Sequence, residues 1–149
     1  MVNQEIISEI HLTVFSDIKY LDIVQCVSDS FFNLVGFEGE DVYWVGLSIR
    51  EAVTNAILHG NKNNSKIPVI LSFKQGTDSL IVTVTDQGEG VDESRLPDPR
   101  DPENLFKPGG RGIFLVKSFM DKVFFSAPEG GGNELVMEKY IKEGEKNED

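Results

Sequence analysis

The sequence predicts an α+β fold, a two-layer α/β sandwich in which helices cover one face of a mostly antiparallel sheet. Five short stretches are rich in β-branched or alternating apolar residues, and three longer stretches repeat apolar residues at three- and four-residue steps. Their order is strand, two helices, two strands, a long loop, a helix and two strands. Short polar turns join neighbouring strands, which favours hairpins and hence antiparallel pairing.

The first half of the chain begins with a strand at residues 5–14, predicted from its β-branched content. A helix follows over residues 17–35, with Ser16 or Asp17 as its N-cap and Gly36 at its end. Cys26 lies among apolar neighbours in this helix, so we expect it to be buried. Because it is the only cysteine, no internal disulfide can form. The second helix opens with carboxylates at residues 38–41 and is expected to continue to Gly60.

The second half begins with strands at residues 69–74 and 79–85, joined by a short turn that predicts a hairpin. Residues 91–110 contain four prolines, so they form a long loop, and loops of this length are often functional. A helix at residues 112–121, a short strand at 123–126 and a last strand at 134–141 complete a single domain over residues 1–141. The charged tail at residues 142–149 is expected to be disordered.

Composition excludes some classes of partner. The chain has 149 residues and a net charge of −11, which disfavours direct binding to nucleic acid or to anionic membrane surfaces. No apolar run approaches the roughly 18 residues that cross a bilayer. The first residues lack the basic start and apolar core of a signal peptide, so a cytoplasmic location is expected.

The first chemical motif lies at the end of the second helix. Glu51, Asn55 and His59 recur every four residues and line one stripe of the helix. Mg²⁺ prefers oxygen ligands and often shares them with substrate phosphates, which suits the Asn55 amide, and Glu51 is placed to act as a general base. His59 is read as a helix-end residue near the C-terminal dipole or as a hydrogen-bond donor behind the ligands. An ordinary exposed polar face explains the same spacing.

Two glycine motifs follow. Asp86, Gly88 and Gly90 come directly after a strand, where a carboxylate can accept from an exocyclic amine such as that of adenine and glycines allow close approach of a ligand. Gly110, Arg111 and Gly112 precede a helix, where free amide groups and a cation attract phosphate. Taken alone, the first motif also fits a simple turn and the second a helix-start loop.

In this order and separation, the motifs resemble the anti-sigma factor serine/threonine kinase family of the GHKL (histidine-kinase-like) ATPase superfamily. The resemblance spans residues 5–141 and implies a Bergerat-type sandwich that binds ATP (or ADP) with Mg²⁺, with residues 91–110 as a lid over the nucleotide. It implies that Glu51 is the catalytic base, that Asn55 ligates Mg²⁺ and that Asp86 holds the adenine amine. It also implies that Gly88 and Gly90 line the base pocket and that Gly110, Arg111 and Gly112 surround the phosphates.

The resemblance further implies partners. Members of the family phosphorylate a serine or threonine of an antagonist protein, bind a sigma factor and are often homodimers. Where the family often has Thr or Ser supporting the adenine-binding Asp, this chain has Asn133. Two alternatives remain: an ATP-gated binding regulator of another partner-switching pathway that lacks catalysis, and a detached catalytic domain of a sensor histidine kinase. The second needs a phosphoacceptor histidine on a dimerisation helix, whereas His11 lies in a predicted strand and His59 lies inside the nucleotide motif.

Overall fold

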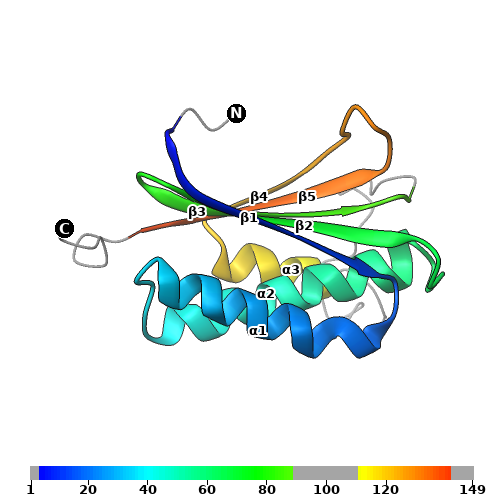
Figure 1. Cartoon of the computed structure of the whole chain (residues 1–149), viewed down its shortest axis with the longest axis horizontal. Coiled ribbons are helices and arrows are strands. Elements are labelled where there is room, and N and C mark those ends of the chain that lie inside the picture. Colours follow the sequence, from blue (N-terminus) through cyan, green and yellow to red (C-terminus); the bar gives the residue numbers. More distant parts are fainter. Residues whose placement is uncertain (1–3, 89–110, 142–149) are drawn as a thin grey trace, which may run out of the picture.

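The computed structural model describes residues 4–88 and 111–141, and it confirms the α+β fold class. One sheet lies on one layer of helices (Figure 1). The strands are β1 (Ile6–Phe15), β2 (Pro68–Gly76), β3 (Ser79–Asp86), β4 (Lys122–Ser126) and β5 (Asn133–Tyr140). The helices are a short 3₁₀ turn η1 (Ile18–Tyr20), α1 (Leu21–Leu34), α2 (Glu40–Asn55), a π-turn η2 (Ala56–Gly60) and α3 (Arg111–Phe119).

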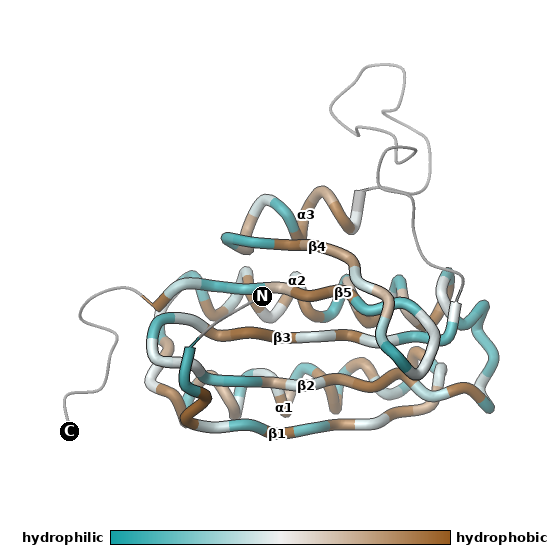
Figure 2. The backbone as a smooth tube through the Cα atoms, turned by 90° about the horizontal axis from the view of Figure 1, so that it is seen from above, coloured by the Kyte–Doolittle hydropathy of each residue, from teal (hydrophilic) through white to brown (hydrophobic). Residues whose placement is uncertain are grey.

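The sheet has the strand order β1-β2-β3-β5-β4, and every described pair of neighbouring strands is antiparallel. Seen from above, the strands run side by side with α1 and α2 beneath them (Figure 2). The last strand, β5, inserts between β3 and β4. In that register Asp86, the last residue of β3, pairs with Asn133, the first residue of β5. The sheet thereby brings two polar residues together that are far apart in the sequence.

The core lies between the sheet and the helices. It contains a group of contacting phenylalanines, in which Phe31 lies 5.7 Å from Phe73 and Phe32 lies 6.1 Å from Phe37, between ring centroids. All four are at most 2% exposed. Full burial of a phenylalanine side chain contributes about 1.5–3 kcal/mol to the stability of the fold. The core thus fixes α1 and α2 against the sheet, and α2 carries the first motif.

The first helix differs from its prediction at two points. It begins as the 3₁₀ turn η1, where the Asp17 carboxylate accepts from the Lys19 amide at 2.9 Å, and it ends as predicted at Gly36, whose φ is 77°. The expectation that Cys26 is buried is wrong, because its side chain is exposed. The buried side of α1 runs through Val24, Ser28 and Phe31, and at about 100° per residue Cys26 lies well away from it.

The second helix was predicted as one continuous α-helix to Gly60, which is wrong for its last turn. The α-helix ends at Asn55, and residues 56–60 form the π-turn η2, closed by the Asn61 amide donating to the Ala56 carbonyl at 2.8 Å. A π-turn holds more residues per turn than an α-helix. Gly60 and Asn61 therefore face a different direction from the one that α-helical winding would give them.

Candidate functional site

The three motifs meet where the end of α2, the end of β3 and the start of α3 come together, on the helix-covered side of the sheet (Figures 1 and 2). The resemblance implied that they share one site, and the contacts described below bring them together. Of the residues expected there, Gly90 and Gly110 lie outside the described residues, as does the segment 91–110 that was expected to be a lid. Arg111 is described only as the first residue of α3.

Glu51 and Asn55 lie one turn apart in the last part of α2, and both are partly buried. Gly112, in the first turn of α3, approaches them closely. A methyl group on Gly112 would lie 2.9 Å from Nδ2 of Asn55 and 3.0 Å from Oε2 of Glu51. Only glycine fits at this position without displacing the two side chains. The start of α3 is therefore in van der Waals contact with the carboxylate and the amide.

Asp86 lies at the end of β3 and is only 6% exposed. Its Oδ1 accepts from the Gly88 amide at 2.7 Å, and the Asn133 side chain donates a further hydrogen bond to its carboxylate. Burial raises the pKa of Asp86 above its ordinary value, and the two hydrogen bonds partly offset this increase. Asn133 thus stands where the family often has Thr or Ser, and it hydrogen-bonds the Asp86 carboxylate.

Three glycines surround Asp86. A methyl group on Gly60 would overlap the Asp86 carboxylate, and one on Gly132 would overlap the Asp86 carbonyl oxygen. A methyl group on Gly88 would lie 2.7 Å from the Gly60 carbonyl oxygen. Gly132 also has a φ of 90°, which other residues rarely adopt. The end of α2, the turn after β3 and the start of β5 can therefore close around one carboxylate only because these positions lack side chains.

Asn61 was read from the sequence only as part of a polar turn, yet it is 3% exposed. Its Oδ1 accepts from the Gln87 amide at 2.8 Å, while its Nδ2 donates to Ser16 Oγ at 2.9 Å and to the Pro68 carbonyl at 3.1 Å. The signal that could have found it is its position directly after Gly60, at the end of the first motif. No periodicity distinguishes a buried Asn from an exposed one in a turn.

His59 lies in the π-turn and is exposed, which agrees with a helix-end residue. Among residues 4–88 and 111–141, no group of three or more His, Cys, Asp or Glu side chains could hold a metal ion by itself. Mg²⁺ commonly takes part of its ligand set from substrate phosphates rather than from the protein alone. The oxygen of the Asn55 amide, partly buried beside Glu51, fits that use.

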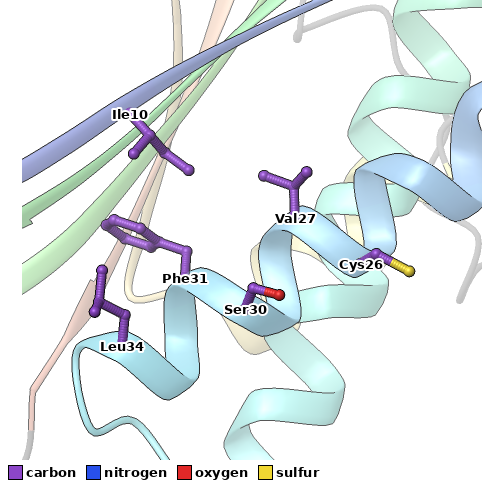
Figure 3. A pocket seen from close by; sticks show the side chains of 6 residues that line it. All are labelled: Ile10, Cys26, Val27, Ser30, Phe31 and Leu34. Carbon is purple, nitrogen blue, oxygen red and sulfur yellow. The ribbon is translucent and has the colours of Figure 1, made fainter.

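A hollow lies apart from these motifs, between β1 and α1. It is an apolar groove of about 300 Å³, lined by Ile10, Cys26, Val27, Ser30, Phe31 and Leu34. Figure 3 shows Ile10 on β1 facing the side chains of α1. Because the groove has no charged lining residue, it does not suit a nucleotide. In the part of the chain that the structure describes, no helix is long and apolar enough to span a membrane.

Comparison with known proteins agrees with the geometry. The family described as "Histidine kinase-like ATPase domain" matches residues 16–139. The serine-protein kinase RsbW of Staphylococcus epidermidis is 34% identical over 131 residues, which cover 83% of this chain and 81% of that protein. The serine-protein kinase RsbW of Staphylococcus aureus (strain JH9) is 28% identical over 140 residues, covering 89% of this chain and 87% of that protein.

Among solved structures, the RsbU and RsbW domains of a Mycobacterium tuberculosis protein superpose with a TM-score of 0.65 at 15% identity. The match covers 91% of this chain and 33% of that longer chain. At this identity the likeness shows the fold, and it agrees with the two-layer sandwich described above.

Proposed function

The chain belongs to the histidine kinase-like ATPase domain family, among relatives named serine-protein kinase RsbW, and on this basis we propose that its site phosphorylates a partner protein. ATP is the phosphoryl donor, and a serine or threonine hydroxyl of the partner is the acceptor. In this proposal Glu51 is the general base, Asn55 ligates Mg²⁺ and Asp86 accepts from the adenine amine. The remaining nucleotide contacts come from His59, Gly88, Gly90, Gly110, Arg111 and Gly112.

One observation carries the proposal: Gly112 contacts both Glu51 and Asn55. The amide groups at the start of α3 are not used within the helix, so they can donate to phosphate oxygens. The contact therefore brings a phosphate-binding helix end, a carboxylate and a metal-ligating amide into one place. Asp86 lies beside Gly60, and Gly60 follows Asn55 by five residues. In this proposal the adenine binds at Asp86 and the phosphates lie between Asn55 and the start of α3.

The chemical step follows from these positions. Glu51 takes the proton from the acceptor hydroxyl while the hydroxyl oxygen forms a bond to the γ-phosphorus. The bond between that phosphorus and the oxygen bridging it to the β-phosphate breaks, and ADP leaves with the electron pair. Mg²⁺, held by Asn55 and phosphate oxygens, would neutralise charge on the phosphates. A correctly placed general base contributes about 10²–10⁴-fold to the rate.

The partners proposed are an antagonist protein that carries the acceptor hydroxyl and a sigma factor that the chain sequesters. We also propose that the chain forms a homodimer. The position of β1 at the edge of the described sheet and the apolar groove beside it support this, because edge strands and apolar surface favour association. Leu34, which lines the groove, is 68% exposed, and Ile23 on the same helix is 51% exposed.

Labelled ATP and a purified candidate antagonist test the kinase. The wild-type chain should transfer label to the antagonist, and Glu51→Gln should lower the rate by about 10²–10⁴-fold while ATP still binds. Glu40→Gln, which removes a carboxylate at the exposed start of the same helix, is the control and should keep the wild-type rate. Labelling by Glu51→Gln at the wild-type rate would show that Glu51 is not the base.

The alternative function, a binding regulator without catalysis, makes a different prediction in the same assay. Affinity for the partner would depend on ATP, but no phosphoprotein would form with the wild-type chain. Glu51 beside Gly112 favours the kinase, because a binding module needs no carboxylate next to the terminal phosphate.

A further inference from the structure

We propose that Asn61 is a positioning residue that sets the preference of the site for adenine, by holding the turn that carries Asp86. The inference rests on the function proposed above, in which Asp86 reads the adenine amine. Asn61 itself lies behind the site and is not expected to touch the nucleotide. It links the end of the first motif to the second motif through the Gln87 amide.

The hydrogen bonds of Asn61 fix its carboxamide in one orientation. Oδ1 must face the Gln87 amide, which can only donate, and Nδ2 must face the Pro68 carbonyl, which can only accept. Both requirements give the same orientation. At 3% exposure, water cannot readily replace these bonds, so loss of the side chain would leave the Gln87 amide without its partner.

Asn61 is in turn held by residues at or next to the ends of β1, β2 and the π-turn. Ser16, at the end of β1, accepts from Nδ2 of Asn61, and its own hydroxyl donates to the Ile67 carbonyl at 2.6 Å. The Asn61 backbone amide closes the π-turn through its bond to Ala56. Asn61 therefore has three separate supports, at Ser16, at the Pro68 carbonyl and at Ala56, so the loss of the Ser16 bond leaves the other two in place.

The Gln87 amide matters because Gln87 lies between Asp86 and Gly88, the first two residues of the adenine motif. Asp86 is its predecessor, and Gly88, its successor, donates to the Asp86 carboxylate. Fixing the middle of this turn fixes the direction of the carboxylate on one side and of the Gly88 amide on the other. Gly60, adjacent to Asn61, contacts the same carboxylate, so residues 60 and 61 hold the turn from two points.

A fixed acceptor gives specificity. A buried carboxylate that cannot turn rejects a purine with an oxygen in place of the amine, because the two acceptors would face each other without a proton between them. If the turn can shift, the carboxylate can rotate away and the wrong base is tolerated. Loss of Asn61 should therefore lower the preference for ATP over inosine triphosphate more than it lowers binding of the triphosphate group.

The test is titration calorimetry of the full chain with ATP, inosine triphosphate and inorganic tripolyphosphate, each with Mg²⁺. Asn61→Ala should reduce the ratio of ATP to inosine triphosphate affinity by about tenfold, with tripolyphosphate affinity within twofold of wild type. Ser16→Ala is the matched control, since it removes a bond of Asn61 on the side away from Gln87. It should lower the melting temperature but keep the wild-type ratio.

Asn61→Asp keeps the acceptor for the Gln87 amide but loses the donor to the Pro68 carbonyl, so it should be less stable than wild type. Its ratio should nevertheless stay within threefold of wild type, and this variant also serves if Asn61→Ala does not fold. Any of three results would overturn the inference. The affinity ratio could be unchanged in Asn61→Ala, it could be as low in Asn61→Asp as in a variant lacking the side chain, or it could fall equally in Ser16→Ala. A wild-type chain that binds ATP but shows no preference over inosine triphosphate would instead contradict the role of Asp86, and this inference with it.

Discussion

Replacing Gly112 by alanine should separate the activity of the site from the stability of the fold. The new methyl group would lie 2.9 Å from Nδ2 of Asn55 and 3.0 Å from Oε2 of Glu51, where ordinary contact begins at 3.4 Å. Both atoms are ends of flexible side chains, so they should move aside by roughly half an ångström. Such a displacement costs little packing energy, but it moves the base and the metal ligand together.

The size of the effect follows from this displacement. A misplacement of about 1 Å in an active site can cost about 10²-fold in rate, so half of that should cost roughly tenfold in kcat/KM. The stability should not fall, because alanine exceeds glycine in helix propensity by up to about 1 kcal/mol within a helix such as α3. Gly112→Ala should thus be slower by about tenfold with a melting temperature equal to or above that of wild type.

Transfer of label from ATP to the antagonist measures the first quantity, and thermal unfolding measures the second. Gly130→Ala is the control, because a methyl group there meets nothing within 4 Å and both quantities should stay at wild-type values. If Gly112→Ala keeps kcat/KM within twofold, the contact between α3 and the two side chains does not govern the reaction. A loss of rate together with a loss of stability would point to disruption of α3 instead.

Three further predictions concern the nucleotide. Asn55→Ala should bind ATP equally with and without Mg²⁺, whereas in wild type Mg²⁺ should strengthen binding; equal wild-type affinities would contradict the metal role. Asn133→Ala should weaken ATP binding about tenfold, since a hydrogen bond to a charged group contributes about 1.5–3 kcal/mol. Asn133→Thr should weaken it by less than threefold, and equal losses of affinity in calorimetry would contradict this. Burial raises the pKa of Asp86, so its contribution to stability is full below its ordinary pKa and is lost as the pH rises through the raised pKa. Asp86→Asn should remove that decrease from melting curves recorded against pH while weakening ATP binding, and an unchanged pH profile would refute the assignment.

The sequence could predict the strands, the helices and their layers because these depend on local periodicity. The resemblance implied that Asp86 supports the base, but only the register of β3 with β5 places Asn133 beside it. This pair is 47 positions apart along the chain, and no local pattern encodes such a contact. The close approach of Gly112 to Glu51 and Asn55 could not be predicted for the same reason, since it depends on how α3 packs against α2.

The errors have local causes. Cys26 is expected in the core because its neighbours are apolar, but it is exposed. One of those neighbours, Ile23, is itself 51% exposed, so apolar residues do not mark the buried side of α1. The turn at residues 56–60 was read as α-helical because its composition suits a helix, and composition does not distinguish α from π winding. Asn61 was missed for a related reason, since its burial follows from that winding.

The π-turn also makes the number of residues at the end of α2 matter, independently of their identity. Removing one residue from Ala56–Gly60 would let α-helical winding continue, and each later residue would turn by about 100° around the helix axis. Gly60 would then leave the Asp86 carboxylate and Asn61 would leave the Gln87 amide. We therefore expect this segment to tolerate substitutions but not insertions or deletions. Proteins with the same site should then share the length of the segment more strictly than its sequence.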